Sequence, residues 1–356
     1  MQKRYEFLAV TIAAIGLILG GTALVSQAAP AGNGQGSNRQ APKPVSATNV
    51  KIFKKIPLPL DETKQIKKPV TPPGKDKIKE EGAATGILGE TLGDGAKKYA
   101  IVIGICDYPG ADYDLCVSDG DSLHTYKALV ENYGYDPDNI TLLKDTGGAA
   151  GDNLGNVVYG VPSRNNIYNA IAEIRDKAVA GDEVAFFFSG HGTNANAEDG
   201  DEEITDEGIV VWGSENPEGN IDFIWDGELR TEFSGFLTNR IAFVFDSCLA
   251  GGMNDVAGEG RIVSMATQET KSAYVYSTAG EDVDGDGTPD GEGVFSHYFA
   301  NEGMLQGLAD AYDHVQGIAD VTVEEAFDYA KNNILPYLKN RQKPVMSDGF
   351  AGDLLF

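Results

Sequence analysis

Near-continuous apolar runs of strand length constrain this chain most. The clearest runs cover residues 99–105, 183–189 and 240–246, and shorter ones cover 140–143 and 272–277. Strands that lack alternating polar and apolar residues are buried on both faces, which is typical of a parallel sheet. We therefore expect these runs to form strands of one buried sheet.

Segments with helical spacing separate the apolar runs. One covers residues 119–133, and a second follows Ser163, which is a good N-cap residue. Two more are expected at 295–306 and 323–338. The sequence thus predicts an α/β fold with a mostly parallel central sheet and helices on both faces.

The 356-residue chain carries a formal net charge of −26. Nucleic acid and anionic membrane surfaces are poor partners for such a chain, because like charges repel. Cationic substrates, cationic partners and metal ions suit it better.

The first residues have the pattern of an export signal. Lys3 and Arg4 precede an uncharged apolar run at residues 7–25, and Ser26-Gln-Ala28 offers small residues for a signal peptidase. Residues 1–28 are interpreted as a signal peptide, with an uncleaved N-terminal anchor as the alternative. Either reading predicts a secreted or cell-envelope protein, which meets the membrane only if this segment is uncleaved.

A basic, proline-rich stretch follows. Residues 31–80 contain eleven Lys or Arg against four Asp or Glu. We interpret residues 29–90 as a linker or propeptide and residues 91–356 as one acidic domain. The positive stretch will tend to associate with that domain, and a solvated spacer is the alternative.

The three cysteines lie at positions 106, 116 and 248. An odd number in an exported protein leaves at least one free thiol. A Cys106–Cys116 disulfide would leave Cys248 free, and three buried thiols are the alternative.

Two of the predicted strands end in reactive residues. One runs into Gly190-His191-Gly192, and another runs through Asp246 and Ser247 to Cys248. Neighbouring parallel strands end at the same edge of a sheet, where sites form. The pair predicts a catalytic dyad, with Cys248 as nucleophile and His191 as general base and acid. The amides of Gly192 and Cys248 are the candidate donors to an oxyanion.

These motifs resemble a known family. Phe187-Phe-Ser-Gly-His-Gly192 together with Phe243-Val-Phe-Asp-Ser-Cys248 is similar to the caspase-like peptidases, and among them to the metacaspases and their bacterial and archaeal relatives. The resemblance covers about residues 97–356. The Gln-Ala-Cys signature of animal caspases is replaced by Asp246-Ser-Cys248, which favours the metacaspase side.

The resemblance implies a caspase-like fold and a cysteine-type endopeptidase that acts on proteins and peptides with Arg or Lys at P1. It also implies an acidic S1 pocket built by Asp119 and Asp246. A carboxylate at this edge would pair with a cationic P1 side chain on charge alone. The alternatives are a helix N-cap for Asp119 and a structural hydrogen bond for Asp246.

Two acidic clusters are candidate calcium sites. Some metacaspases are calcium-activated, and the resemblance implies Asp206, Asp226 and Asp255 as ligands, with a solvated acidic loop as the alternative. The second cluster has the spacing of the start of an EF-hand loop, although its twelfth position is Gly293. Its candidate ligands are Asp282, Asp284, Asp286 and Asp290. We expect bound Ca²⁺ to assist the enzyme.

The chain also offers sites for self-processing. Caspase-like enzymes are often cut after the nucleophile strand, where Arg261 and Lys271 lie, so a zymogen with the linker as its propeptide is expected. One alternative is another peptidase of the same clan, clostripain-like or legumain-like, with a different P1 preference. The other is an inactive exported calcium-binding domain of caspase-like fold.

Overall fold

The computed structural model describes residues 41–66, 82–115, 117–144, 159–200, 203–213, 219–276 and 291–356. All of them belong to one compact unit, Asn38–Phe356, and the other unit, Met1–Ser37, falls outside the described residues. None of the described helices is long and apolar enough to cross a membrane. The predicted signal peptide lies outside the described residues.

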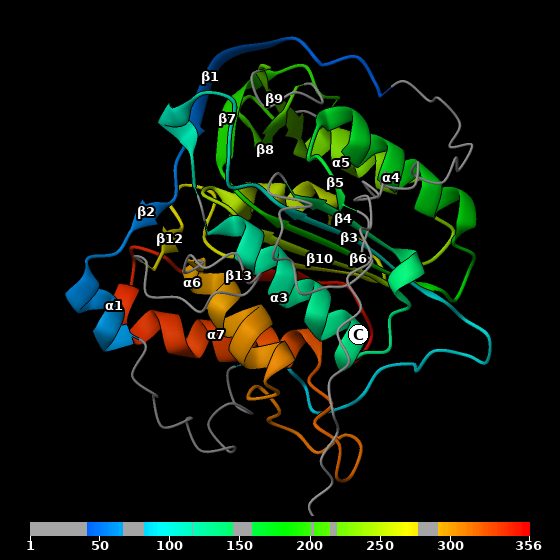
Figure 1. Cartoon of the computed structure of the whole chain (residues 1–356). Coiled ribbons are helices and arrows are strands. Elements are labelled where there is room, and N and C mark those ends of the chain that lie inside the picture. Colours follow the sequence, from blue (N-terminus) through cyan, green and yellow to red (C-terminus); the bar gives the residue numbers. More distant parts are fainter. Residues whose placement is uncertain are drawn as a thin grey trace, which may run out of the picture. The chain divides into compact units, whose positions relative to one another are not determined.

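A seven-stranded sheet forms the centre of the fold, in the order β13-β11-β10-β6-β3-β4-β5. Every neighbouring pair is parallel except β11 with β13. This confirms the predicted α/β fold (Figure 1). The strands are β3 (Lys98–Gly104), β4 (Ile140–Lys144), β5 (Tyr159–Gly160), β6 (Glu183–Ser189), β10 (Ile241–Asp246), β11 (Arg261–Met265) and β13 (Val345–Asp348).

Successive residues of the central strands pack on opposite faces of the sheet. On β3, Ala100 and Val102 belong to one core cluster, whereas Ile101 and Ile103 belong to the other. Helices cover both faces, as the parallel topology requires (Figure 1). The first cluster receives α3 (Ser118–Glu131), α6 (Val294–Ser296), the π-helix η4 (His297–Leu305) and α7 (Val323–Leu338), and the second receives α4 (Arg164–Lys177) and α5 (Asp226–Phe233).

Local signals explain where two of the helices begin. The Ser163 hydroxyl accepts a hydrogen bond from Asn166 N at 3.2 Å and caps α4, as predicted. Thr322 and Glu325 form a reciprocal capping box at the start of α7. Both caps satisfy amide groups that would otherwise lack a partner in the first helical turn.

A second sheet includes the strand that begins directly after His191. It is four-stranded and antiparallel, in the order β1-β7-β8-β9. Its strands are β1 (Ala47–Phe53), β7 (Gly192–Ala197), β8 (Asp206–Trp212) and β9 (Ile221–Trp225). A small parallel pair joins β2 (Ile56–Pro57) to β12 (Tyr274–Val275), and α1 (Leu60–Ile66) and three 3₁₀ turns complete the described elements: η1 (Ala111–Tyr113), η2 (Pro137–Asn139) and η3 (Ala250–Val256).

The structure corrects the expectation about one strand and decides between two expectations about the basic stretch. The strand beyond β10 in the central sheet is β11, at 261–265, and not the run at 272–277. Of that run, only Tyr274–Val275 is a strand, and it pairs with β2 outside the central sheet. The described part of the basic stretch, residues 41–66, contributes β1, β2 and α1, so this part associates with the acidic domain and is not a solvated spacer.

Candidate active site

The predicted dyad lies at one edge of the central sheet. Strands β6 and β10 are parallel neighbours, with Ser189 opposite Asp246 at their carboxyl ends. Gly190 N donates to Asp246 O at 3.2 Å, which holds the two strand ends together. His191 and Cys248 each follow two residues later, so both leave the sheet at the same edge, as expected from the sequence.

The backbone around the nucleophile is tightly packed. A Cβ on Gly192 would come within 1.9 Å of the Cys248 carbonyl oxygen, so only glycine fits beside this turn. Leu249, directly after the nucleophile, has a left-handed φ of 59° although it is not glycine. Such strain is often found at functional sites. The geometry brings together the two residues predicted to form the oxyanion hole, and the donation itself stays a prediction.

Three contacts orient the His191 ring. Its Nε2 lies 2.8 Å from the Tyr113 carbonyl oxygen. A carbonyl only accepts, so Nε2 carries the proton and Nδ1 is left as the basic nitrogen. The ring also stacks on Tyr108 at 4.8 Å, and the Tyr108 hydroxyl accepts from His191 N at 2.8 Å. These contacts hold the imidazole in the tautomer that a general base needs, with Nδ1 unprotonated.

Both members of the dyad are 1% exposed. Burial raises the pKa of the Cys248 thiol to about 11, although hydrogen bonds from Ala273 N and Ser272 oppose the shift. Burial, with smaller effects of Lys55 and Lys54, lowers the pKa of His191 to about 4. In this structure the dyad is therefore a neutral thiol beside a neutral imidazole, which is not the reactive pair.

A lysine from the basic stretch fills a carboxylate pocket beside the dyad. The Lys55 ammonium lies 3.0 Å from Asp246 Oδ1 and 3.8 Å from Asp121 Oδ2, and it donates to Ser189 Oγ at 2.9 Å. The side chains of all three charged residues are fully buried. The main-chain nitrogen of Lys55 points at His191 Nδ1, 3.4 Å away.

The pocket carboxylates are held in place from behind. Asp246 Oδ2 accepts from both Ser296 N and Ser296 Oγ, at 3.0 and 2.7 Å. Asp121 accepts from Ser189 Oγ at 2.6 Å and from Gly293 N at 3.0 Å. Burial raises the pKa of Asp121, and the nearby Lys55 ammonium opposes that shift.

Of the two predicted S1 residues, Asp246 lies in the pocket, where its carboxylate contacts Lys55. The second carboxylate that contacts Lys55 is Asp121, which the sequence analysis did not single out. A role of Asp119 in this pocket stays a prediction. The helix N-cap is Val117, so the capping alternative for Asp119 is wrong. Lys55 was not singled out, because the sequence does not distinguish it from Lys54.

The two predicted self-cleavage sites differ in accessibility. Arg261 begins β11, and its amide and carbonyl are hydrogen-bonded to Gly258 and Gly349. A protease could reach it only after local unfolding. Lys271 lies in the connection between β11 and β12 and is partly exposed, although its carbonyl accepts from Leu249 N.

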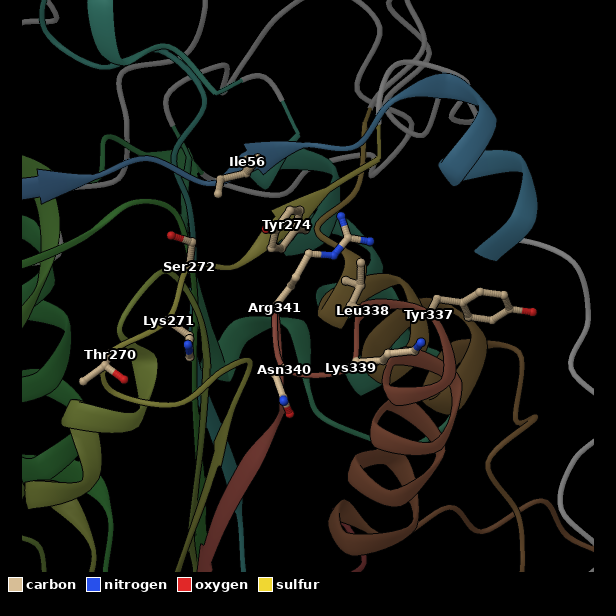
Figure 2. A pocket seen from close by; sticks show the side chains of 10 residues that line it. All are labelled: Ile56, Thr270, Lys271, Ser272, Tyr274, Tyr337, Leu338, Lys339, Asn340 and Arg341. Atoms are coloured by element: carbon tan, nitrogen blue, oxygen red, sulfur yellow. The ribbon is translucent and has the colours of Figure 1, made fainter.

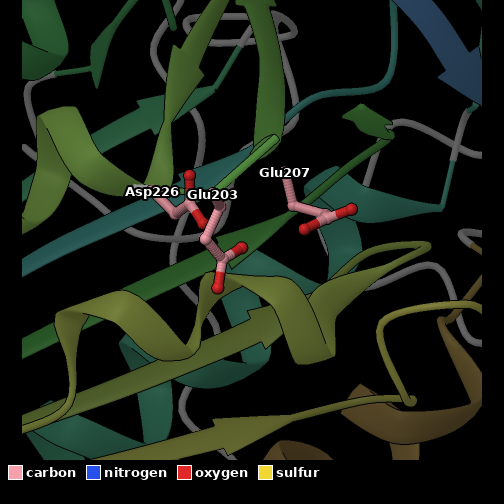
Figure 3. Close-up of side chains that lie close together, drawn as sticks. All are labelled: Glu203, Glu207 and Asp226. Atoms are coloured by element: carbon pink, nitrogen blue, oxygen red, sulfur yellow. The ribbon is translucent and has the colours of Figure 1, made fainter. Parts of the chain in front are cut away.

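Three carboxylates come together from β8, from the loop before it and from the start of α5. Ligand oxygens of Glu203, Glu207 and Asp226 all lie within 4.8 Å of one another (Figure 3). Asp226 is fully buried, and its Oδ2 has no hydrogen-bond partner among the residues that the structure describes. Burial, Asp199 and Asp255 raise its pKa to about 10. The group suits a hard cation, which prefers oxygen ligands.

One of the three ligands that the resemblance implies, Asp226, belongs to this cluster. The other two have partners of their own: Asp206 accepts from Ala197 N at 2.7 Å, and Asp255 pairs with Arg230 at 3.0 Å. Calcium binding by these residues stays a prediction. The sequence analysis did not single out Glu203 and Glu207, because glutamates in an acidic stretch cannot be distinguished from those of a solvated loop. The EF-hand-like candidates Asp282, Asp284, Asp286 and Asp290 lie outside the described residues.

The cysteines differ in state. Cys106 is disulfide-bonded, and Cys248 is free and buried. Cys116 lies outside the described residues.

Comparisons with known proteins point to one family. Residues 98–257, which include His191 and Cys248, match the family model described as metacaspase, peptidase C14 domain. Metacaspase-4 of Arabidopsis thaliana is 34% identical over 165 residues, which is 46% of this chain and 35% of that protein. Metacaspase-7 of the same plant is 35% identical over 184 residues, covering 51% and 41%. The chain thus spans less than half the length of these relatives.

Proposed function

Residues 98–257 belong to the metacaspase family of caspase-like cysteine peptidases, and from this premise we propose that the protein is an endopeptidase that cleaves after Lys or Arg. The observation that carries the proposal is the Lys55 ammonium between Asp246 and Asp121, beside the dyad. A pocket that holds one lysine in this way also suits a substrate lysine. Arginine fits the same chemistry, since its guanidinium pairs with carboxylates bidentately.

Each residue of the dyad has a defined role in this reaction. His191 Nδ1 takes the proton of Cys248, and the thiolate attacks the carbonyl carbon of the P1 residue. The Tyr113 carbonyl keeps the other ring nitrogen protonated, so the imidazole cannot turn away. His191 then returns the proton to the leaving amine. The amides of Gly192 and Cys248 would stabilise the negative oxygen in between.

The chain is made in a latent form, according to this proposal. We call residues 47–58 the inhibitory segment: β1 pairs with β7, β2 pairs with β12, and Lys55 between them fills the pocket. The segment buries the dyad and leaves the thiol protonated at neutral pH. Displacement or cleavage of the basic stretch, by the enzyme itself or by another peptidase, would open the cleft.

Calcium assistance is proposed from the carboxylate cluster. Glu207 lies opposite Asn194 on β7, the strand that follows the histidine. Its side chain also packs against Gly252, four residues after the nucleophile. A cation held by Glu203, Glu207 and Asp226 would tie the two catalytic loops together and replace repulsion among acids with coordination.

Export is proposed from residues 1–28 alone. N-terminal sequencing of the protein recovered outside the cytoplasm would test it: a start near Ala29 supports signal cleavage. A start at Met1 in a membrane fraction supports the anchor.

The deciding experiment is hydrolysis of fluorogenic peptides with Arg, Lys, Asp or Asn at P1. It uses the full chain and its Lys55→Ala variant, with and without calcium, beside a Cys248→Ala control. Cleavage after Arg or Lys that the control lacks supports the proposal. Cleavage only after Asp or Asn would favour another peptidase of the clan. No cleavage under any condition would favour the inactive calcium-binding domain.

A further inference from the structure

A cationic cavity of about 710 Å³ adjoins the nucleophile (Figure 2). We infer that it is a substrate subsite that selects an acidic side chain at P2, P3 or P4, ahead of the basic P1 residue. The inference rests on the proposed endopeptidase function. It concerns the residues around the cleavage site and not the P1 pocket itself.

The cavity is connected to the dyad by short contacts. Lys271 lies on its wall, and its main-chain carbonyl accepts a hydrogen bond from Leu249 N, next to Cys248, at 2.8 Å. Ala273, the residue after Ser272 on the wall, donates its main-chain N–H to Cys248 Sγ at 3.2 Å. Ile56, the residue after the pocket lysine, lines the cavity next to Tyr274 (Figure 2). A peptide bound in the cleft therefore passes this cavity within a residue or two of S1.

The direction of the inhibitory segment shows which substrate residues these are. In a productive complex, the residue in S1 supplies the attacked carbonyl, and the leaving nitrogen beside the histidine belongs to the next residue. Here the nitrogen at His191 Nδ1 is that of Lys55 itself, whose side chain fills the pocket. The segment therefore lies across the dyad with reversed polarity.

The residues after Lys55 lie on the side of the cavity. Ile56 N and Leu58 N donate to the carbonyls of residues 273 and 275, at 2.9 and 2.8 Å, so the segment runs parallel to β12. A substrate positioned for cleavage runs the opposite way. Its P2 to P4 residues therefore lie where Ile56 to Leu58 lie in this structure.

The charge of the cavity is opposite to that of the chain. Lys271 and Lys339 lie on its two sides, with Arg341 between them (Figure 2). None of its lining residues that the structure describes is acidic, although the chain carries a net charge of −26. Such a local concentration of positive charge favours a carboxylate in the peptide.

The chain itself already places a carboxylate at this position. Glu62, on α1 just beyond the inhibitory segment, pairs with Arg341 at 2.7 Å. Both side chains are partly exposed, so the ion pair is weak and a substrate carboxylate can replace it. The same stretch thus supplies a lysine to S1 and a glutamate to the cationic cavity.

The test is a set of fluorogenic tetrapeptides with Arg at P1 and with Glu, Gln or Lys in turn at P2, P3 and P4. The full chain and its Lys55→Ala variant are assayed with calcium. We expect kcat/KM to be about fivefold higher for Glu than for Gln at one or more of these positions, and lowest for Lys. Arg341→Gln and Lys339→Gln should each reduce that ratio about two- to fivefold, the size of an exposed charge pair. High salt should reduce it as well.

Arg175→Gln is the matched control, because Arg175 pairs with Glu232 on the α4 side of the sheet and lies outside the cavity. It should leave the ratio unchanged. Equal rates for Glu and Gln at all three positions would overturn the subsite, as would a ratio that survives both cavity variants. If neither chain cleaves any peptide with Arg or Lys at P1, the proposed function itself fails, which is a distinguishable result.

Discussion

Two groups of carboxylates lie near the dyad, the S1 pocket and the acidic cluster of Glu203, Glu207 and Asp226, and they differ in what surrounds their buried members. In the S1 pocket, Asp121 and Asp246 face the Lys55 ammonium of the same chain. In the acidic cluster, Asp226 has Asp199 and Asp255 as neighbours, and both raise its pKa further. Burial raises the pKa of Asp121 as well, but there the lysine opposes the shift.

The difference shows two ways to reduce the free-energy cost of burying a carboxylate. The proposed S1 pocket is neutralised by the Lys55 side chain, which a basic substrate residue would replace according to the proposed function. The acidic cluster needs protons or an added cation. The comparison therefore predicts that Lys55 variants change the dyad and that calcium changes the cluster.

The largest expected effect is on the reactivity of Cys248. Only the thiolate is alkylated, and a pKa of about 11 leaves roughly one thiol in 10⁴ ionised at pH 7. The rate of iodoacetamide labelling in the intact chain should rise about tenfold per pH unit up to that value. Lys55→Ala should open the cleft to water and shift the midpoint to lower pH, because burial is the largest cause of the raised pKa and outweighs the smaller opposing effect of the Lys55 charge.

Lys54→Ala is the matched control for that measurement. Lys54 is the neighbouring lysine, and its ammonium contacts the Asp112 carbonyl instead of the pocket. It should leave the midpoint near that of the intact chain. Identical midpoints for all three proteins would show that the inhibitory segment does not control the thiol.

The next effect is on folding stability. Asp246→Ala leaves a fully buried lysine without its closest carboxylate, which should lower the free energy of unfolding by about 3–5 kcal/mol. Lys55→Met combined with Asp246→Ala should recover part of that loss, since the buried ammonium is then removed together with its closest carboxylate. Urea unfolding of the single and double variants measures the coupling. Strictly additive losses would contradict a buried ion pair.

Calcium should bind at the acidic cluster and stabilise the folded chain. Saturating calcium at about a hundred times its Kd stabilises a protein by about 2.7 kcal/mol, which we expect to observe as a higher Tm of the intact chain. Asp226→Asn should abolish that increase. In chelator it should have little effect, because the native carboxyl, with a pKa of about 10, is already protonated at neutral pH.

The exposed Asp94 provides the control for calcium, since Asp94→Asn should keep the full Tm increase. A calcium-induced increase that persists in Asp226→Asn would place the cation elsewhere.

The smallest expected effect is a difference in unfolding free energy between two glycine variants. One glycine lies beside the S1 pocket and the other beside the acidic cluster. A Cβ on Gly293 would lie 2.2 Å from Asp246 Oδ2, and one on Gly227 would lie 2.6 Å from Asp199 Oδ2. Asp246 is held by Ser296 and Lys55 and cannot retreat. Gly293→Ala should therefore cost about 1–3 kcal/mol of unfolding free energy, and more than Gly227→Ala does. A larger loss for Gly227→Ala than for Gly293→Ala, measured by urea unfolding, would show that the S1 pocket adjusts more easily to an added methyl group.

Much of the fold was predictable because its signals are local. The runs at β3, β6 and β10 are near-continuously apolar and lie in the centre of the sheet, where both faces are covered. β11 was missed because its run is short, and the equally apolar stretch at 272–277 competed with it. Which of two such runs joins the sheet depends on its neighbours, here β10 and β13.

The sequence by itself determined the dyad. His191 and Cys248 each directly follow a buried parallel strand, and chain connectivity then delivers both side chains to one sheet edge. Only the tertiary structure decided that Asp121 completes the pocket, that Lys55 fills it and that Glu207 joins Asp226. These are contacts between segments far apart in the chain, and their free energies depend on burial and on neighbouring charges. Such quantities exist only once the chain has folded.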